Sequence, residues 1–196
     1  MLDLLDWKRR IFELYAEVRR TPNPQHAWRH WRDTRDALFR SHRQSPLPVE
    51  ARRDFESVAY FPYDPGLRVL AEVVPARGER RLIPGSTGSP VVFSRFAIAR
   101  SRVGELELYW LEGYGGGVFL PFGDATNGRE TYSAGRYLLD TVKGADLGTE
   151  DGRLVLDFNF AYNPSCSYDP RWACPLTPPE NRLELEIRAG ERSQAI

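Results

Sequence analysis

VVFSRFAIARSRVGELELYW, residues 91–110, decides the fold class of this chain. VVFSRFAIA at 91–99 and GELELYW at 104–110 are rich in β-branched and aromatic residues, and their hydrophobic period is close to two. That period is typical of strands with one buried face. The intervening SRVGE contains turn residues. The stretch therefore predicts two short strands joined by a tight turn.

The same pattern continues through the chain after residue 55. Further strands are expected in LRVLAEVV at 67–74, GVFLPF at 117–122, GRYLLDTV at 135–142, RLVLDFNFAY at 153–162 and RLELEIR at 182–188, with two short additions near 57–61 and 80–83. Turn-forming segments such as PARGE, GYGGG and TEDGR separate them. Six to nine short strands with tight turns predict a mainly β (α+β) fold, an antiparallel β-barrel or sandwich.

The first forty residues instead carry helical periodicity. Apolar residues recur at intervals of three and four: Leu4, Trp7, Ile11, Leu14 and Val18, then Trp28, Trp31 and Leu38 with Arg35 on the same face. Asn23 can cap the second helix and Pro24 suits its first position. Because both helices have an apolar stripe to bury, we expect them to pack on the β core. The prediction is a single domain over 1–196, with a helical segment at 1–45 and a β core at 55–191.

Composition narrows the class of protein. Lys and Arg total 27 and so do Asp and Glu, so the formal net charge is zero and no overall charge favours nucleic acid. No apolar run approaches the ~20 residues that span a bilayer, and the charged start MLDLLDWKRRIFELY does not resemble a signal peptide. We expect a cytoplasmic protein with neither nucleic-acid nor membrane partner. No cofactor motif is present, and the sequence carries no signature of a particular oligomeric state.

Two polar clusters are candidates for chemistry. In RLVLDFNFAY, strict alternation would place Asp157 and Asn159 on one strand face, either in solvent or lining a pocket. PFGDATNGRETYSAGRYL, residues 121–138, contains good turn residues but also Asp124, Glu130, Tyr132 and Arg136. An arginine among carboxylates and phenols indicates either a buried hydrogen-bonded network or an anion-binding group.

The two cysteines, Cys166 and Cys174, have seven residues between them, which is not a zinc-binding spacing. A disulfide, metal ligation with His42 or a carboxylate, and a catalytic thiol with His42 as its base are alternatives, but two packed thiols are the commonest outcome. His26 and His30 stand four residues apart on the second predicted helix, and surface or packing roles are expected for them. We predict no metal site.

Two segments of the chain form recognisable motifs. The first is the 121–138 segment, and the second and longer one is LDFNFAYNPSCSYDPRWACPLTPPENRLELEIRAGE at 156–191. Together they resemble DUF1684, an uncharacterised bacterial and archaeal family, and the resemblance covers most of residues 30–191. It implies no established activity. It implies that these motif residues form either a shared site or a shared structural knot.

Two hypotheses follow. In the first, a polar pocket in the barrel binds a small anionic or hydroxylated ligand and the protein acts as a hydrolase on it. Asp157, Asp124 and Cys166 are then the candidate catalytic residues, and the candidate ligand-binding residues are Arg136, Asn159, Glu130, Tyr132, Tyr162, Asn163 and His42. In the second, the chain is a non-catalytic interaction or structural module whose motif residues form a buried hydrogen-bond network.

Overall fold

The computed structural model describes residues 1–193, in which two α-helices precede a seven-stranded antiparallel sheet. The helices are α1 (Leu2–Arg20) and α2 (Pro24–Ser41). The strands are β1 (Arg68–Ile83), β2 (Val91–Ser101), β3 (Gly104–Leu111), β4 (Gly117–Phe122), β5 (Arg136–Asp140), β6 (Thr149–Glu150) and β7 (Arg153–Asp157). Short 3-10 helices are η1 (Glu50–Arg52), η2 (Pro65–Leu67), η3 (Thr141–Lys143), η4 (Phe158–Phe160), η5 (Ser165–Ser167) and η6 (Pro179–Asn181).

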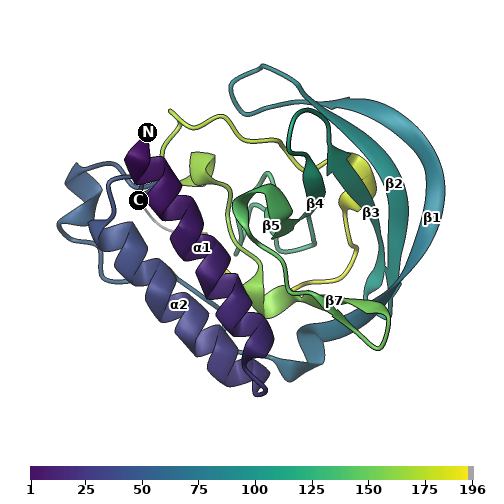
Figure 1. Cartoon of the computed structure of the whole chain (residues 1–196), viewed down its shortest axis with the longest axis horizontal. Coiled ribbons are helices and arrows are strands. Elements are labelled where there is room, and N and C mark those ends of the chain that lie inside the picture. The colour runs from purple at the N-terminus through teal and green to yellow at the C-terminus, as the bar shows by residue number, and fades with distance from the viewer. Residues whose placement is uncertain (194–196) are drawn as a thin grey trace.

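The sheet has the order β5-β4-β3-β2-β1-β7-β6 and curls into a half-barrel (Figure 1). The hairpin predicted at 91–110 is present as β2 and β3. The stretches expected at 67–74 and 80–83 are one long strand, β1, whose pairing with β2 shifts register between Pro75 and Glu79. An irregularity of this kind bends a strand, and proline is tolerated at such points. The bend lets β1 follow the curl of the sheet.

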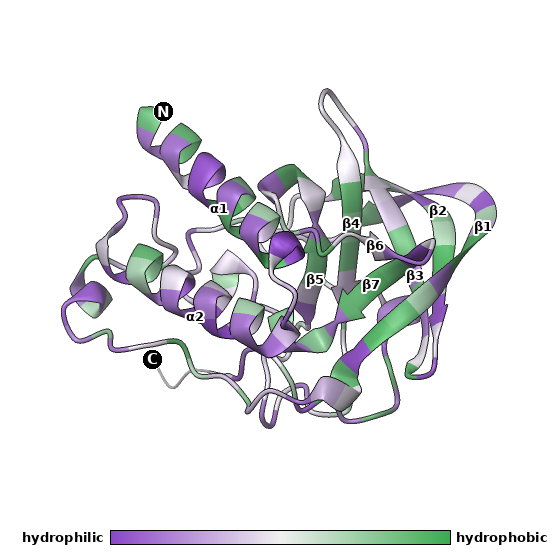
Figure 2. Ribbon diagram, turned by 60° about the horizontal axis from the view of Figure 1, so that its bottom comes forward, coloured by the Kyte–Doolittle hydropathy of each residue, from purple (hydrophilic) through white to green (hydrophobic). Residues whose placement is uncertain are grey.

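The two helices lie side by side against one side of the curled sheet (Figure 1), as expected. Their buried faces include Ile11, Leu14, Val18, Trp28, Trp31 and Leu38, and they pack with Val155 and Phe160 in one apolar cluster. In Figure 2 the helices are striped with hydrophobic and hydrophilic residues, whereas the middle of β7 is continuously hydrophobic. Asn23 caps α2, because its side chain accepts a hydrogen bond from the backbone of His26 at 3.0 Å. Neither helix in the described part of the chain is long and apolar enough to cross a membrane.

The strand expected over 153–162 ends earlier than predicted. β7 stops at Asp157, because the side chain of this residue accepts a hydrogen bond from the backbone of Asn159 and starts η4. An aspartate that bonds the backbone two residues ahead favours a turn over an extended strand. Alternation predicted that Asp157 and Asn159 share one face of a strand. That prediction is wrong. The two residues are consecutive parts of one turn.

The prediction of a strand at 182–188 is also wrong: Leu183 and Ile187 are buried, but Leu185 between them is 53% exposed, and no strand forms there. Its backbone bonds loop residues and side chains: Leu183 donates to Gly123 at 2.9 Å and Leu185 accepts from Ala125 at 3.0 Å, while Ile187 bonds the side chains of Asp124 and Arg136. Alternation requires an extended chain, but a strand also requires a neighbouring strand as partner. The short strand expected near 57–61 is likewise reduced to an isolated bridge between Tyr60 and Glu191.

Candidate functional site

Asp157 is the last residue of β7, and hydrogen bonds hold one of its two carboxylate oxygens in place. Oδ1 accepts hydrogen bonds from the backbone N and the side-chain Nδ2 of Asn159, at 3.0 and 2.8 Å. Oδ2 has only the Tyr63 hydroxyl, at 3.4 Å. The residue is 2% exposed, and this burial raises the pKa of the Asp157 carboxyl to about 6, against the lowering effect of the Asn159 hydrogen bonds. One oxygen is therefore fixed and the other is left with little protein contact.

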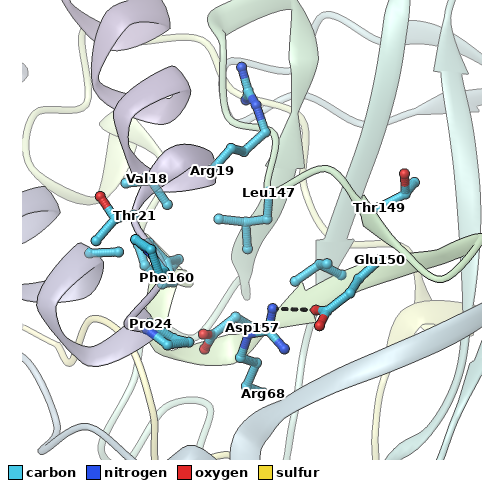
Figure 3. A pocket seen from close by; sticks show the side chains of 13 residues that line it. Val18, Arg19, Thr21, Pro24, Arg68, Leu147, Thr149, Glu150, Asp157 and Phe160 are labelled. Atoms are coloured by element: carbon cyan, nitrogen blue, oxygen red, sulfur yellow. Dashed lines mark hydrogen bonds and ion pairs between the residues drawn. The ribbon is translucent and has the colours of Figure 1, made fainter.

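Arg68 on β1 lies directly opposite Asp157 on the neighbouring strand β7. The two residues are register partners in the antiparallel pairing of β1 with β7, and directly opposed side chains share a sheet face. The Arg68 guanidinium also donates to Glu150 Oε2 at 2.7 Å. Figure 3 shows Asp157 close to Arg68, whose contact with Glu150 is dashed. The Arg68 guanidinium and the carboxylates of Glu150 and Asp157 are thus close together beside β7.

A pocket of about 250 Å³ lies between these groups and the helices. Its walls come from the end of α1, the α1–α2 turn, the start of α2 and strands β6 and β7 (Figure 3). The lining residues are Val18, Arg19, Thr21, Pro22, Pro24, Ala27, Arg68, Leu147, Thr149, Glu150, Val155, Asp157 and Phe160. The pocket combines an apolar wall with convergent charged and hydroxyl groups, which is typical of small-molecule sites.

Asn159 holds this corner together from beneath the pocket. Its side chain bonds both the N–H and the carbonyl of Asp64, each at 2.8 Å, and its own carbonyl accepts from Trp28 Nε1 at 2.9 Å. Asn159 is fully buried, so it orients Asp157 and fastens α2 and the 64–66 turn to the end of β7.

Asp124 and Arg136 do not share this pocket. Arg136 Nη2 donates to Asp124 Oδ2 at 2.8 Å, and both side chains are inaccessible to solvent. Arg136 also donates to the carbonyls of Ile187, Ala189 and Glu191. The guanidinium thus binds three alternate carbonyls along one edge of the extended C-terminal segment. The expectation that Asp124, Arg136 and Asp157 line one cavity is therefore wrong.

A second buried network surrounds Glu191. Its carboxylate pairs with Arg35 of α2 and accepts from the Tyr168 hydroxyl at 2.5 Å and from the backbone of Asn163 at 2.7 Å. Asn163 also donates from Nδ2 to the Arg192 carbonyl at 2.9 Å. Sequence reasoning assigned no role to this charge pair, because Arg35 and Glu191 are 156 positions apart. The only available signal was an arginine on the apolar face of the second helix.

The other predicted site residues lie apart from the pocket. Glu130 forms a surface ion pair with Arg188 at 3.0 Å. Tyr162 pairs its backbone with that of Tyr137 on β5, at 2.8 and 3.0 Å. His42 contacts Asp6 at 3.0 Å.

Tyr132 and Cys166 are in contact, with the Tyr132 hydroxyl 3.8 Å from Cys166 Sγ. The ring of His42 bonds Asp6 and the backbone N–H of Gln44, and no hydrogen bond joins His42 to Cys166 in residues 1–193. Within the same described part, no group of three or more His, Cys, Asp or Glu is clustered as a metal ion would need.

A family model described as "Protein of unknown function (DUF1684)" matches residues 53–192. The chain belongs to the DUF1684 family. It is also similar to an uncharacterized protein of Haloarcula marismortui with a solution NMR structure, at 35% sequence identity and a TM-score of 0.57. That match covers 82% of this chain and 89% of the other. Among curated proteins, none matches this chain.

Some residues that line the pocket lie within the DUF1684 match and others precede it. Arg68, Glu150 and Asp157 fall within residues 53–192, whereas Arg19 and Pro24 precede them. Sequence reasoning singled out Asp157 because, with Asn159, it is a polar residue inside an otherwise apolar predicted strand. It missed Arg68 and Glu150, because only the pairing of β1 with β7 and of β6 with β7 brings them beside Asp157.

Proposed function

We propose that this DUF1684 protein binds a small hydroxylated molecule in the Asp157 pocket and that Asp157 exchanges a proton with it. The observation that carries the proposal is the unequal bonding of the Asp157 carboxylate. Oδ1 takes both Asn159 hydrogen bonds, whereas Oδ2 has one long contact. A carboxyl group whose pKa is raised to about 6 can both accept and donate a proton near neutral pH.

The charges of the pocket support a hydroxylated ligand. Arg68 supplies hydrogen-bond donors, while Glu150 and Asp157 supply acceptors, and Thr149 can do both. Because the Arg68 charge is already paired with Glu150 at 2.7 Å, a strongly anionic ligand would have to displace that carboxylate. A neutral polyol or a hydroxylated molecule with one weak charge satisfies these groups without breaking the pair.

Hydrolysis of a small polar substrate is the reaction that these groups would support without a cofactor. Asp157 would act as the general acid or base, and Arg68 would orient the substrate beside it. Asn159 would keep Asp157 in place without contacting the substrate. The volume of about 250 Å³ suits a substrate of small-metabolite size.

The experiment is a thermal-shift screen of polyols, sugars and hydroxy acids, followed by calorimetry on each hit. Asp157→Asn and Arg68→Ala should abolish binding, since each removes a group that faces the ligand. Arg100→Ala is the matched control, because Arg100 forms an exposed ion pair with Glu105 on strands β2 and β3 and does not line the pocket. Hits that bind Asp157→Asn and Arg68→Ala as tightly as the wild type would refute the proposal.

The second candidate function is a non-catalytic interaction or structural module. The buried pairs Asp124–Arg136 and Arg35–Glu191 favour it, because their charged groups are almost inaccessible to solvent and join distant parts of the chain. In that case no screened ligand binds at the pocket, and Asp157→Asn changes only the stability of the fold.

A further inference from the structure

The segment after η4 brings both cysteines together. Cys166 lies in η5, and its backbone N–H points at Cys174 Sγ from 3.4 Å. Both are free thiols, Cys166 half-buried and Cys174 buried. They are also the only two cysteines of the chain. Two sulfur atoms so placed are a candidate dithiol pair, separate from the Asp157 pocket.

The surroundings make the two thiols unequal. The Cys174 thiol hydrogen-bonds to Cys166, and further hydrogen bonds from Ser86 and Tyr132 help to hold the pKa of Cys166 below its ordinary value, although burial opposes this. The same contact with Cys166, together with burial, raises the pKa of Cys174. Cys166 is therefore the better nucleophile, since the thiolate is the reactive form, and Cys174 keeps its proton.

Cys174 is held in a fixed position relative to Cys166. Its N–H donates to Ser86 Oγ at 3.0 Å and its carbonyl accepts from the Ser86 N–H at 2.8 Å. Ser86 Oγ in turn donates to the Trp172 carbonyl at 3.0 Å. The turn after β1 thus fastens the loop that carries the second thiol.

An open pocket of about 320 Å³ reaches the pair on the side of Cys174, while the half-buried Cys166 is itself partly accessible to solvent. Cys174 and Ser165, the neighbour of Cys166, both line the pocket, together with Trp7, Trp172 and Lys143. An accessible thiol with a second thiol in reach is the arrangement of a reversible redox centre.

We propose that Cys166 and Cys174 form a peroxide-reactive dithiol, in which Cys166 reduces hydrogen peroxide and Cys174 resolves the product as an intramolecular disulfide. The Cys166 thiolate attacks one peroxide oxygen, the O–O bond breaks, and the second oxygen leaves as water after protonation. Cys166 is then a sulfenic acid. The Cys174 sulfur displaces its hydroxyl, so the S–S bond forms, the S–O bond breaks and a second water leaves. Two thiols are oxidised, the peroxide is reduced to two waters, and an external dithiol regenerates the pair.

The test is treatment of the purified, reduced protein with one equivalent of hydrogen peroxide at pH 7. The wild type should lose both titratable thiols and the mass of two hydrogen atoms while remaining a monomer on a non-reducing gel. Cys174→Ser should instead gain one oxygen atom and react with a sulfenic-acid probe. Cys166→Ser should react at least about ten-fold more slowly, because the remaining Cys174 thiol is buried and burial raises its pKa.

Tyr132→Phe separates a positioning role of Tyr132 from a purely structural one. Removing the hydroxyl near Cys166 should raise the pH midpoint of Cys166 alkylation, which is measured in the Cys174→Ser background, without lowering the thermal midpoint. The proposal is overturned by any of three results: two thiols still titratable after peroxide, equal rates for the two single-cysteine variants, or a disulfide found only between chains. Matched thermal midpoints for all variants exclude unfolding as the cause of altered reactivity.

Discussion

Arg136 donates from Nη2 to Asp124 Oδ2 at 2.8 Å in a site where neither side chain touches solvent. Arg136 also binds the carbonyls of Ile187 at 2.9 Å and Glu191 at 3.1 Å. Asp124 accepts from the Ile187 N–H at 3.2 Å. The pair therefore attaches the C-terminal segment to the start of β5. It takes the place of the backbone hydrogen bonds that a neighbouring strand would provide.

Replacing Arg136 should be one of the most damaging single changes in the chain. Arg136→Met leaves Asp124 buried without its counter-charge, and breaking one side of a buried ion pair costs about 3–5 kcal/mol. Urea denaturation should show a loss in this range. Arg188→Met is the control, because it breaks the exposed pair with Glu130 in the same region, and its midpoint should hardly move. Equal midpoints for the two variants would contradict the role assigned to Arg136.

The Tyr168 hydroxyl should contribute measurably to stability through Glu191. Tyr168→Phe removes a 2.5 Å hydrogen bond to a buried carboxylate and keeps the ring, so the expected loss is ~1.5–3 kcal/mol. Chemical denaturation of the two proteins measures it. Tyr114→Phe, at an exposed tyrosine, serves as the reference and should be neutral. A neutral result for Tyr168→Phe as well would show that the hydroxyl is replaceable.

Asp157 should make stability depend on pH in an unusual direction for a carboxyl group. Its folded pKa of about 6 lies above the ordinary value of 3.8, so the folded state holds the proton more tightly. Its contribution to stability is present below pH 4 and is lost as pH rises through 6, by ~2–3 kcal/mol between pH 4 and 7.

The comparison that isolates this proton is wild type against Asp157→Asn. Asparagine retains an oxygen that can accept both Asn159 hydrogen bonds but does not titrate. Urea denaturation across this pH range should show the stability of the wild type falling relative to the variant. A constant difference between the two would mean that the Asp157 pKa is not raised.

Gly190 should tolerate no side chain, because a Cβ there would lie 2.5 Å from the Ala161 carbonyl oxygen. Its φ of +73° is also in the left-handed region. Gly190→Ala should therefore reduce the free energy of unfolding by well over the ~1–2 kcal/mol expected for the backbone conformation alone. The loss is measured as a lower thermal midpoint. Gly88→Ala is the matched control: its φ is +86°, and a Cβ there would meet nothing within 4 Å. Similar midpoints for both would show that the contact at Gly190 relaxes easily.

Local sequence patterns determined the helices, the 91–110 hairpin and most of the strands. The Asn23 cap and the strand at 117–122 appear where the pattern placed them, because both depend on neighbours within a few residues. Asp157 was also singled out locally, since an aspartate inside an apolar strand pattern stands out.

Only the tertiary structure decided what those elements and residues bond to. RLELEIR at 182–188 has the sequence alternation of a strand, yet Leu185 is exposed, so the pattern fixed neither the burial of each apolar side chain nor a backbone partner. Its partners are loop residues and a guanidinium from β5. Arg68 reaches Asp157 only through the β1–β7 register, and Glu191 reaches Arg35 only when the last described segment returns to α2. Contacts between such distant positions depend on how the whole chain closes on itself, whereas side-chain periodicity records only the local conformation of each segment.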